Sequence, residues 1–281
     1  MDLSIVIVNW NTRDHLRRCL ESVFANPPHA RFETIVVDNA SADGSADMVR
    51  DSFPTARLVA NQENAGYARG NNQAISLSSG SLILLLNPDT EAKPGALESL
   101  PAFGKSHPDA AAVGCRLVHP DGRVQMSCRS FPEPMPVLFE YLRLSRLFPK
   151  SRLFGAYRMT YLDYAQEAEV DQPMGSCLLL SRAALDDVGL FDDQFPIFFN
   201  EVDWCYRARQ KGWKVYFTPS AEVIHHGAGS TRQVRREMAL ESHRSLKRFY
   251  AKHYRGRIAA PVYWLIMCAI SISSFFASRL R

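Results

Sequence analysis

The polar triplet Asn87-Pro88-Asp89 directly follows an uninterrupted apolar run, Leu82–Leu86. The run predicts a strand buried on both faces, and ligands of open α/β sheets bind at the carboxyl ends of strands. A carboxylate there suits a hard divalent cation that also holds a phosphate, so Asp89 is a candidate metal ligand. Because Asn, Pro and Asp also favour turns, a simple turn after a core strand is the alternative interpretation.

Two further features converge on the same predicted edge. Asp38 ends the apolar segment 34–37, and a carboxylate there can accept the imide N–H of a pyrimidine base. The stretch 64–72 opens a predicted helix, where the helix N-terminal amides, the close approach that Gly66 allows, and Arg69 suit a diphosphate. A loop carboxylate and an ordinary polar helix start are the alternatives.

A pair of carboxylates, Glu201 and Asp203, follows the aromatic run 195–199. Surroundings that exclude water raise the pKa of a carboxyl group and suit it to act as a general base. Residues two apart on a helix diverge, so the two acids are expected to have different functions.

Two adjacent histidines, His225 and His226, end a predicted strand over 221–227. Adjacent strand side chains point to opposite faces, so at most one of the two faces the site easily. A lone strand histidine is usually structural. The neighbouring Gly229 and Ser230 indicate a flexible loop, which favours a ligand role.

The composition indicates a globular protein without a nucleic-acid partner. The 281 residues are 46% hydrophobic and carry a net charge of only +4. The six cysteines show neither a CxxC pair nor metal-ligand spacing, which indicates reduced thiols in a cytosolic protein. The first residues run straight into a strand pattern, so no signal peptide is expected.

The first hundred residues alternate strand and helix signals, which predicts an α/β fold with a parallel, doubly wound sheet. Further on we expect short β pieces over 111–118, a mobile loop with helical pieces over 131–165, and strands over 177–180, 214–217 and 221–227. Neither a G-x-G-x-x-G nor a P-loop motif follows any strand. One domain over 1–231 with a helical extension over 232–281 is the simplest organisation.

The C-terminal extension combines a basic part with an apolar part. Residues 232–257 contain nine Lys or Arg and two acids, and residues 258–278 contain no charge before Arg279 and Arg281. A basic helix followed by an apolar segment is typical of an anchor on the cytoplasmic face of a membrane. The apolar segment is also long enough to span a bilayer, and a helix pair packed on the core is a further alternative.

The motifs together resemble inverting family 2 glycosyltransferases of the GT-A fold, especially bacterial rhamnosyltransferase-like members. The resemblance covers about residues 1–255. The stretches that carry it are S-I-V-I-V-N-W-N at 4–11, V-V-D-N-A-S at 36–41, N-A-G-Y-A-R-G-N-N at 64–72, L-N-P-D-T at 86–90, F-F-N-E-V-D-W at 198–204 and H-H-G-A-G-S at 225–230. This fold has a mostly parallel central sheet, here with C-terminal helices.

The resemblance implies a role for each matching residue. Asp89 matches the carboxylate of the family's D-x-D-like motif that binds Mg²⁺ or Mn²⁺, His225 the metal or diphosphate ligand of the third motif, and Glu201 the catalytic base. The nucleotide-sugar site it implies is formed by Val8, Asn9, Asn11, Asp38, Asn64, Gly66, Arg69, Asn87 and Asp89.

The implied reaction moves one sugar from a nucleoside diphosphate donor, dTDP-rhamnose or a UDP-sugar, to a hydroxyl of a cell-envelope saccharide acceptor that is lipid-linked. The Q-x-x-R-W motif of processive synthases is absent, which favours single-sugar transfer. The expected location is the cytoplasm, peripheral to the inner face of the cell membrane.

Two residues depart from the family pattern. Asn87 stands where many relatives have Asp, and Asn200 where relatives often have Glu. These departures are the support for one alternative, a catalytically inactive protein that binds nucleotide sugars. A nucleotidyltransferase is a further alternative, but it usually needs a glycine-rich basic loop where this chain has Asn9-Trp10-Asn11-Thr12.

Overall fold

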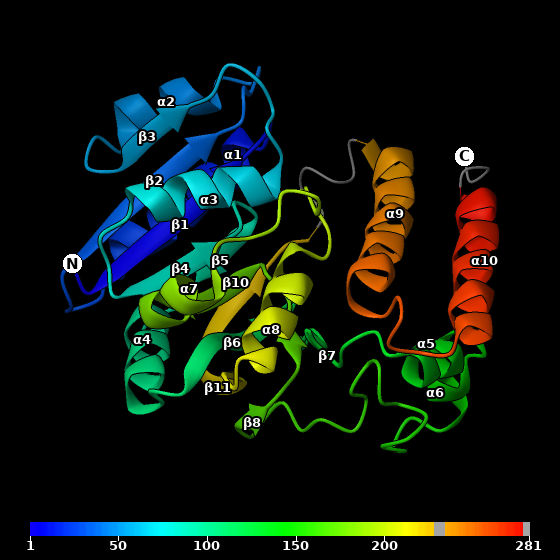
Figure 1. Ribbon diagram of the computed structural model, residues 1–281. Coiled ribbons are helices and arrows are strands. Elements are labelled where there is room, and N and C mark those ends of the chain that lie inside the picture. Colours follow the sequence, from blue (N-terminus) through cyan, green and yellow to red (C-terminus); the bar gives the residue numbers. More distant parts are fainter. Residues whose placement is uncertain (228–233, 278–281) are drawn as a thin grey trace.

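The computed structural model describes residues 1–227 and 234–277. Gly229, Ser230, Arg279 and Arg281, together with the expected domain boundary at 231/232, lie outside the described residues. Figure 1 shows a central sheet with helices on both faces and a pair of long helices to one side of it.

The strands follow the order of the chain. They are β1 Leu3–Asn9, β2 Phe32–Asp38, β3 Arg57–Ala60, β4 Leu82–Leu86, β5 Thr90–Ala92, β6 Ala110–Val118, β7 Cys128–Arg129, β8 Ala168–Glu169, β9 Gln172–Pro173, β10 Cys177–Ser181 and β11 Lys214–His225. The main sheet has nine strands, eight of them in the order β3-β2-β1-β4-β10-β6-β11-β5, with β8 paired to β11. β7 and β9 form a separate two-stranded sheet.

The helices alternate with the first strands and dominate the C-terminal part. They are α1 Arg13–Ala25, α2 Ser45–Ser52, α3 Tyr67–Leu77, α4 Ala96–Ser106, α5 Pro134–Tyr141, α6 Leu144–Leu147, α7 Arg182–Val188, α8 Asn200–Gln210, α9 Arg235–His253 and α10 Ala260–Ala277. The helical pieces expected within 131–165 are α5 and α6.

The sheet is parallel where the chain alternates strand and helix. β1 pairs in parallel with β2 and β4, and β2 pairs in parallel with β3. β10 lies antiparallel between β4 and β6, and the short strands β5 and β8 each pair antiparallel with β11. Every residue of β4 is buried, as the apolar run predicts, because helices cover both faces of the sheet. The prediction of an α/β fold with a mostly parallel sheet is confirmed.

The alternation of β1 divides the core into two layers. Leu3, Ile5 and Ile7 pack with residues of α1, α2 and α4 on one face. Val6 and Val8 pack with residues of α3, α7 and α8 on the other face. Adjacent strand residues point to opposite faces, so one strand contributes to both layers.

In two places the sequence predicts a pair of short strands where the structure has one continuous strand. The pieces over 111–118 form the single strand β6. The pieces over 214–217 and 221–227 form β11, with an irregularity between Thr218 and Glu222, which pair with the neighbours Cys115 and Arg116. Pro219 lies in the irregular stretch, and a proline has no N–H to donate to the ladder. The sequence pattern therefore predicts two strands, although β11 continues through this irregular stretch.

The two C-terminal helices pack together beside the sheet. His243 Nε2 of α9 lies 2.9 Å from Ser273 Oγ of α10. Phe249 of α9 and Ile270 of α10 belong to the same hydrophobic cluster as α8. Among the described residues, α10 is the one helix long and apolar enough to cross a membrane, and only 11% of it is buried.

Helix α8 is tied to α9 by a buried ion cluster. The Asp203 carboxylate is inaccessible to solvent and lies 2.8 Å from Arg207 Nε and 2.7 Å from both Lys252 Nζ and His253 Nε2. Burial alone would raise the pKa of Asp203, but hydrogen bonds from His253 and Lys252 and the charge of Arg207 outweigh it and lower the pKa. The lowered pKa means that the cluster stabilises the fold when Asp203 is ionised.

The substitution Asp203→Asn is expected to lower the free energy of unfolding by about 3–5 kcal/mol at pH 7, because it removes the charge at the centre of a buried cluster and leaves the partly buried Arg207 without its carboxylate partner. Since the folded pKa lies below the unfolded one, this contribution is present above about pH 4 and is lost as the pH falls through the folded value. Urea denaturation of both proteins from pH 7 to pH 3 measures it. As a control, Asp47→Asn removes the exposed pair with Arg50 and should cost less than about 1 kcal/mol. Equal losses in the two variants would contradict the role of the cluster.

Candidate active site

The strands β1, β2 and β4 place polar side chains at one edge of the sheet. Asp38 ends β2 and is only 2% exposed. Its Oδ2 accepts a hydrogen bond of 2.9 Å from Asn9 Nδ2, and its Oδ1 accepts one of 2.9 Å from Ser41 N. These bonds fix the orientation of the carboxylate at the carboxyl end of the strand.

Val8, Asn9 and Asn11 lie beneath and beside Asp38. Val8 packs under α3, and Asn9 is fully buried, so neither lines an open surface. Asn11 Oδ1 accepts a hydrogen bond from Ala42 N, and Asn11 has a φ of 50°. Ala40 also has a positive φ, of 57°. Non-glycine residues rarely adopt this conformation, and such positions concentrate at functional sites.

The N-terminal amides of α3, which the sequence suggested for a diphosphate, already donate hydrogen bonds within the protein. Tyr67 N and Ala68 N donate to the carbonyl of Pro196, at 2.7 and 3.1 Å. Gly66 has a φ of 88°, and an added Cβ would lie 3.2 Å from Pro196 O, so the close approach that this glycine allows is to Pro196. The first amides of the helix are therefore engaged within the protein.

Asn64 and Arg69 lie near this helix start but are used locally. Asn64 Oδ1 accepts a hydrogen bond of 3.0 Å from Gly66 N. Arg69 Nε donates to Asp193 Oδ2 at 2.9 Å, and both side chains are exposed. A diphosphate contact by Arg69 therefore requires this surface ion pair to open, at a cost of about 1 kcal/mol or less.

His225 is the histidine that faces Asp89. Its Nε2 lies 3.6 Å from Asp89 Oδ1 and 3.3 Å from Ser176 Oγ. His226 points elsewhere, with its Nε2 2.7 Å from Glu91 Oε1. The two rings therefore diverge, as strand geometry predicts for adjacent residues.

Gln125 fixes which nitrogen of His225 carries the proton. Gln125 Nε2 donates to the carbonyl of His225 at 2.7 Å, so its Oε1 accepts from His225 Nδ1, at 2.8 Å. Burial lowers the pKa of His225, although the nearby Asp89 charge raises it, so the surroundings favour the neutral ring. The lone pair of Nε2 then faces Asp89, which is the arrangement of a metal-ligating histidine with an outer hydrogen-bond partner.

Asn87, two residues before Asp89, offers a further oxygen. Its amide Oδ1 is buried without a hydrogen-bond partner, while its backbone N donates to Ser176 O at 2.8 Å. A carboxylate, an amide oxygen and an imidazole are donors that Mg²⁺ or Mn²⁺ accepts, so Asp89, Asn87 and His225 fit such an ion. Within residues 1–227 and 234–277 no group of three or more His, Cys, Asp or Glu side chains forms a complete metal site, so oxygens of a bound phosphate would have to complete the coordination.

Glu201 is an acid without a cationic partner. It is the second residue of α8, which begins at Asn200 after the N-cap residue Phe199, whose φ is 68°. Burial raises the pKa of Glu201 to about 7, against smaller opposing effects of the backbone N–H groups of Glu201 and Val202. No described Lys, Arg or His forms an ion pair with it, whereas Asp203 is fully paired. The two acids therefore differ as their spacing predicts.

The segment Gly175-Ser176 links Glu201 to the Asp89 group. Ser176 contacts both Asn87 and His225, and an added Cβ on Gly175 would lie 3.6 Å from Glu201 Cδ. The Tyr67 hydroxyl donates to Gly175 O at 3.2 Å, and burial, followed by the Glu201 charge, raises the pKa of Tyr67. Sequence reasoning missed these residues. The one signal in the sequence was that two small residues, Gly175 and Ser176, directly precede the buried strand β10.

Comparison with known proteins defines the class. The family profile described as "Glycosyl transferase family 2" matches residues 4–189, and the chain belongs to this family. It is a glycosyltransferase, which confirms the family resemblance and excludes the nucleotidyltransferase alternative.

The relatives refine this assignment. The chain is 29% identical to the N-acetylglucosaminyl-diphospho-decaprenol L-rhamnosyltransferase of Mycobacterium tuberculosis, over 99% of this chain and 93% of that protein. It superposes on the mannosyltransferase PcManGT from Pyrobaculum calidifontis, solved with GDP-Man and Mn²⁺, with a TM-score of 0.62, 18% identity and coverage of 98% and 71% of the two chains.

A second solved structure is GalNAc-T7 with UDP, GalNAc and Mn²⁺. The TM-score is 0.60 at 16% identity, over 80% of this chain, which spans 44% of that protein. At these identities the likeness shows the fold, which is GT-A.

The substitution Glu201→Gln is expected to stabilise the protein at high pH. The folded pKa lies near 7 and the ordinary value near 4.5, so the ionised carboxylate costs folding free energy that is fully present above pH 7 and absent below about pH 4. The variant should gain up to about 3 kcal/mol at pH 8 and nothing at pH 4. Thermal and urea unfolding at both pH values measure this. A variant less stable than wild type at pH 8 would show that Glu201 has a stabilising partner.

Proposed function

We propose that this glycosyltransferase moves a single sugar from dTDP-rhamnose or a UDP-sugar to a hydroxyl of a lipid-linked saccharide, with inversion at the anomeric carbon. The observation that carries the proposal is the proximity of two unlike centres. Asp89, Asn87 and His225 form a group suited to a cation, and Gly175-Ser176 connects it to Glu201, whose pKa is near 7. The full-length similarity to a rhamnosyltransferase named for a diphospho-decaprenol acceptor supports the donor and acceptor classes.

The nucleotide is proposed to bind along the edge formed by β1 and β2. Asp38, held by Asn9 and Ser41, accepts the imide N–H of a pyrimidine base. Val8, Asn9 and Asn11 support this edge from below, and Asn64, Gly66 and Arg69 lie on the side of the diphosphate. A purine lacks the matching imide, with the exception of guanine, whose larger ring system changes the distance to Asp38.

A divalent cation, Mg²⁺ or Mn²⁺, is proposed to be held by Asp89 and His225, with Asn87 Oδ1 as a further ligand. When bound, it neutralises the negative charge that develops on the departing diphosphate. Gln125 keeps the lone pair of His225 Nε2 directed at Asp89, and Ser176 keeps Asn87 in place.

Glu201 is proposed as the general base. Its carboxylate takes the proton of the acceptor hydroxyl while the hydroxyl oxygen bonds to the anomeric carbon, and the bond from that carbon to the diphosphate breaks on the opposite face. A base with a pKa near the working pH combines a populated ionised form with useful basicity. Asn200 Nδ2 donates to Ile197 O at 2.7 Å and holds the chain before Glu201. The asparagine at this position, where relatives often have Glu, thus has a structural role and does not favour an inactive protein.

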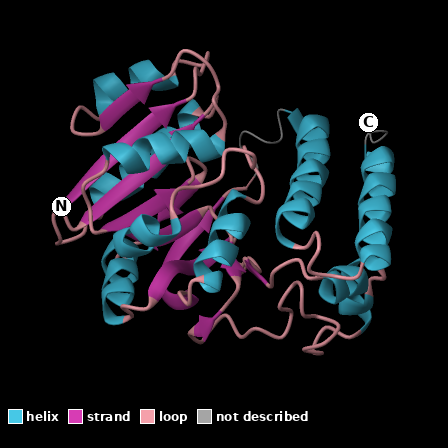
Figure 2. Cartoon of the chain, viewed as in Figure 1, coloured by secondary structure: helices cyan, strands magenta, loops and turns pink. Residues whose placement is uncertain are grey.

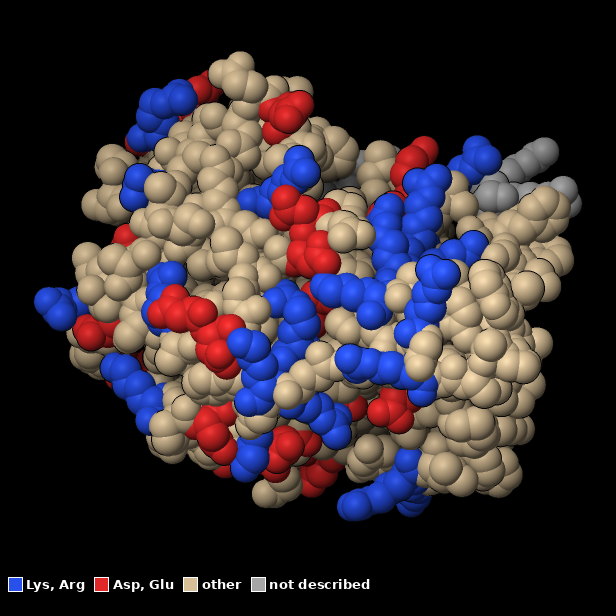
Figure 3. Space-filling view, viewed as in Figure 1, with Lys and Arg blue, Asp and Glu red and all other residues tan. Residues whose placement is uncertain are grey.

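The C-terminal helices are proposed to hold the enzyme at the cytoplasmic face of a membrane, with 1–231 as the catalytic domain and 232–281 as the extension. The large side chains of α10 are exposed, with Leu265 at 71% and Trp264 at 60%. Figure 3 shows Lys and Arg gathered over α9, beside the largely uncharged surface of α10. An apolar face with adjacent cations suits an anionic bilayer surface.

Glu201→Gln is expected to lower kcat by roughly 10²–10⁴-fold while donor affinity stays near wild type, because the amide keeps the shape and loses the basicity. Steady-state transfer kinetics and donor calorimetry separate the two quantities. Glu21→Gln, an exposed position on α1, serves as the matched control and should leave both unchanged. If Glu201→Gln retains a near-normal kcat, the base must be another residue.

Asp89→Ala is expected to abolish metal-dependent donor binding, and His225→Ala to weaken it partially, as measured by Mn²⁺ titration with UDP or dTDP present. Asn87→Asp should tighten metal binding, because it replaces a neutral oxygen by a carboxylate. His226→Ala is the control, since its ring contacts Glu91 and not Asp89. Undiminished transfer in excess EDTA would contradict the metal site.

A further inference from the structure

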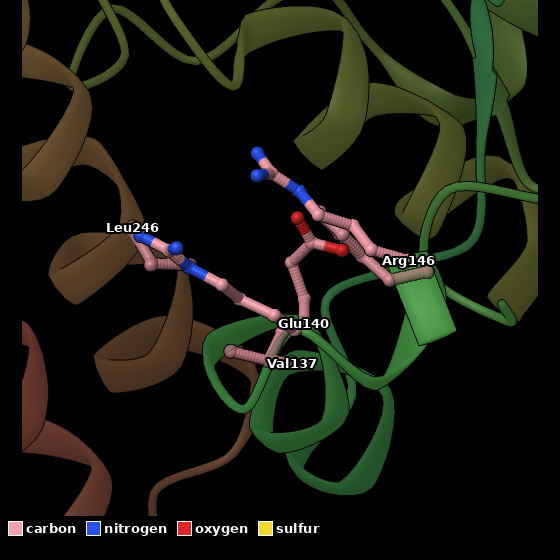
Figure 4. Close-up of a pocket in the computed structure, with 6 residues that line it drawn as sticks. Val137, Glu140, Arg146 and Leu246 are labelled. Carbon is pink, nitrogen blue, oxygen red and sulfur yellow. The ribbon is translucent and has the colours of Figure 1, made fainter. Parts of the chain in front are cut away.

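A cavity of about 340 Å³ lies between α9 and the α5–α6 segment, apart from the Glu201 site. Its lining residues are Val137, Glu140, Arg143, Arg146, Tyr157 and Leu246. Figure 4 shows Val137, Glu140 and Arg146 on one wall and Leu246 of α9 on the other. The volume is within the range of small-molecule sites.

The charge in this cavity is unbalanced. The Glu140 carboxylate is already paired, because Arg158 Nε donates to its Oε1 at 2.6 Å and Ser145 Oγ donates to its Oε2 at 2.8 Å. Among the described residues, the guanidinium groups of Arg143 and Arg146 form neither an ion pair nor a hydrogen bond. Two arginines are thus available to an anion, and their forked donors match phosphate oxygens.

The surroundings of the cavity are apolar and exposed. Leu138, Leu142, Leu147 and Phe148 on the α5–α6 segment are each at least 46% exposed. In Figure 1 this segment lies at the lower end of the α9–α10 pair, and α10 itself exposes large apolar side chains such as Trp264 and Leu265. A soluble anion would gain nothing from these exposed side chains, whereas a phosphate attached to an apolar chain contacts both the arginines and the aliphatic surface.

We propose that this cavity binds the phosphate group of a membrane lipid. Arg143 and Arg146 hold the phosphate oxygens, and the lipid chain passes over Val137 and Leu246 toward the exposed leucines. The inference rests on the proposed membrane face, and it adds a specific lipid contact to it. An anionic phospholipid and a polyprenyl phosphate share this chemistry, and the two are separated by the experiment.

The test is co-sedimentation of the full chain with three kinds of vesicle: phosphatidylcholine alone, phosphatidylcholine with phosphatidylglycerol, and phosphatidylcholine with a polyprenyl phosphate at matched surface charge. The variant Arg143→Gln/Arg146→Gln removes both cations. The control Arg50→Gln/Arg57→Gln removes the same charge from α2 and β3, at the opposite end of the molecule in Figure 1.

Wild type is expected to prefer both phosphate-bearing vesicles, and the Arg143/Arg146 variant to lose about 25-fold in affinity for them, since each arginine near an anionic surface contributes roughly 1 kcal/mol. The control should lose little, because charges farther from the surface than about 10 Å are screened. Arg143→Lys/Arg146→Lys keeps the charge without the fork and should bind with intermediate affinity. Tighter binding to the polyprenyl phosphate assigns the site to the acceptor lipid, tighter binding to phosphatidylglycerol assigns it to a phospholipid, and equal binding shows that the site recognises the phosphate that both lipids carry.

Equal affinity of wild type and the Arg143/Arg146 variant, or an equal loss in the control, would overturn the proposal. So would the failure of wild type to prefer phosphate-bearing vesicles. Binding of wild type to neutral vesicles tests the apolar face by itself, and sugar transfer by wild type in detergent tests the proposed function by itself. A failure of the phosphate site is therefore distinguishable from a failure of either.

Discussion

The position of helix α8 depends on the ion cluster around Asp203. This carboxylate is buried and lies against Arg207, Lys252 and His253, and Lys252 also contacts Asp192. The cluster joins α8 to α9, and among the described residues Glu201, two positions before Asp203, has no ion-pair partner. One acid thereby keeps a lowered pKa and the other a raised one, although they are only two residues apart.

The antiparallel strand β10 connects this helix to the edge of the parallel sheet. Because β10 runs opposite to β4, it begins where β4 ends, and its preceding residues Gly175 and Ser176 lie between Glu201 and Asn87. A glycine at 175 leaves room for the Glu201 side chain. The antiparallel position of β10 in the sheet thus brings Glu201 close to Asn87 and Asp89, which lie much earlier in the sequence.

Much of this arrangement could be predicted from the sequence. The burial of β4, the strand–helix alternation and the divergence of His225 and His226 all follow from residue periodicity. The engagement of the α3 amides by Pro196 could not be predicted, because Tyr67 and Ala68 are far from Pro196 in the sequence. The role of Asp203 in joining two helices, the bulge at Pro219 and the position of Ser176 depend likewise on strand order and long-range pairing, which local patterns do not encode.

The central claim is that Glu201 is a base because the protein holds it half-buried, without a cationic partner among the described residues. The pH dependence of kcat at saturating donor and metal tests this most directly. For wild type, log kcat should rise with unit slope up to about pH 7 and then level off, and for Glu201→Gln the slope should vanish. A wild-type profile that is flat from pH 5 to pH 8, or a slope that persists in the variant, would contradict the account.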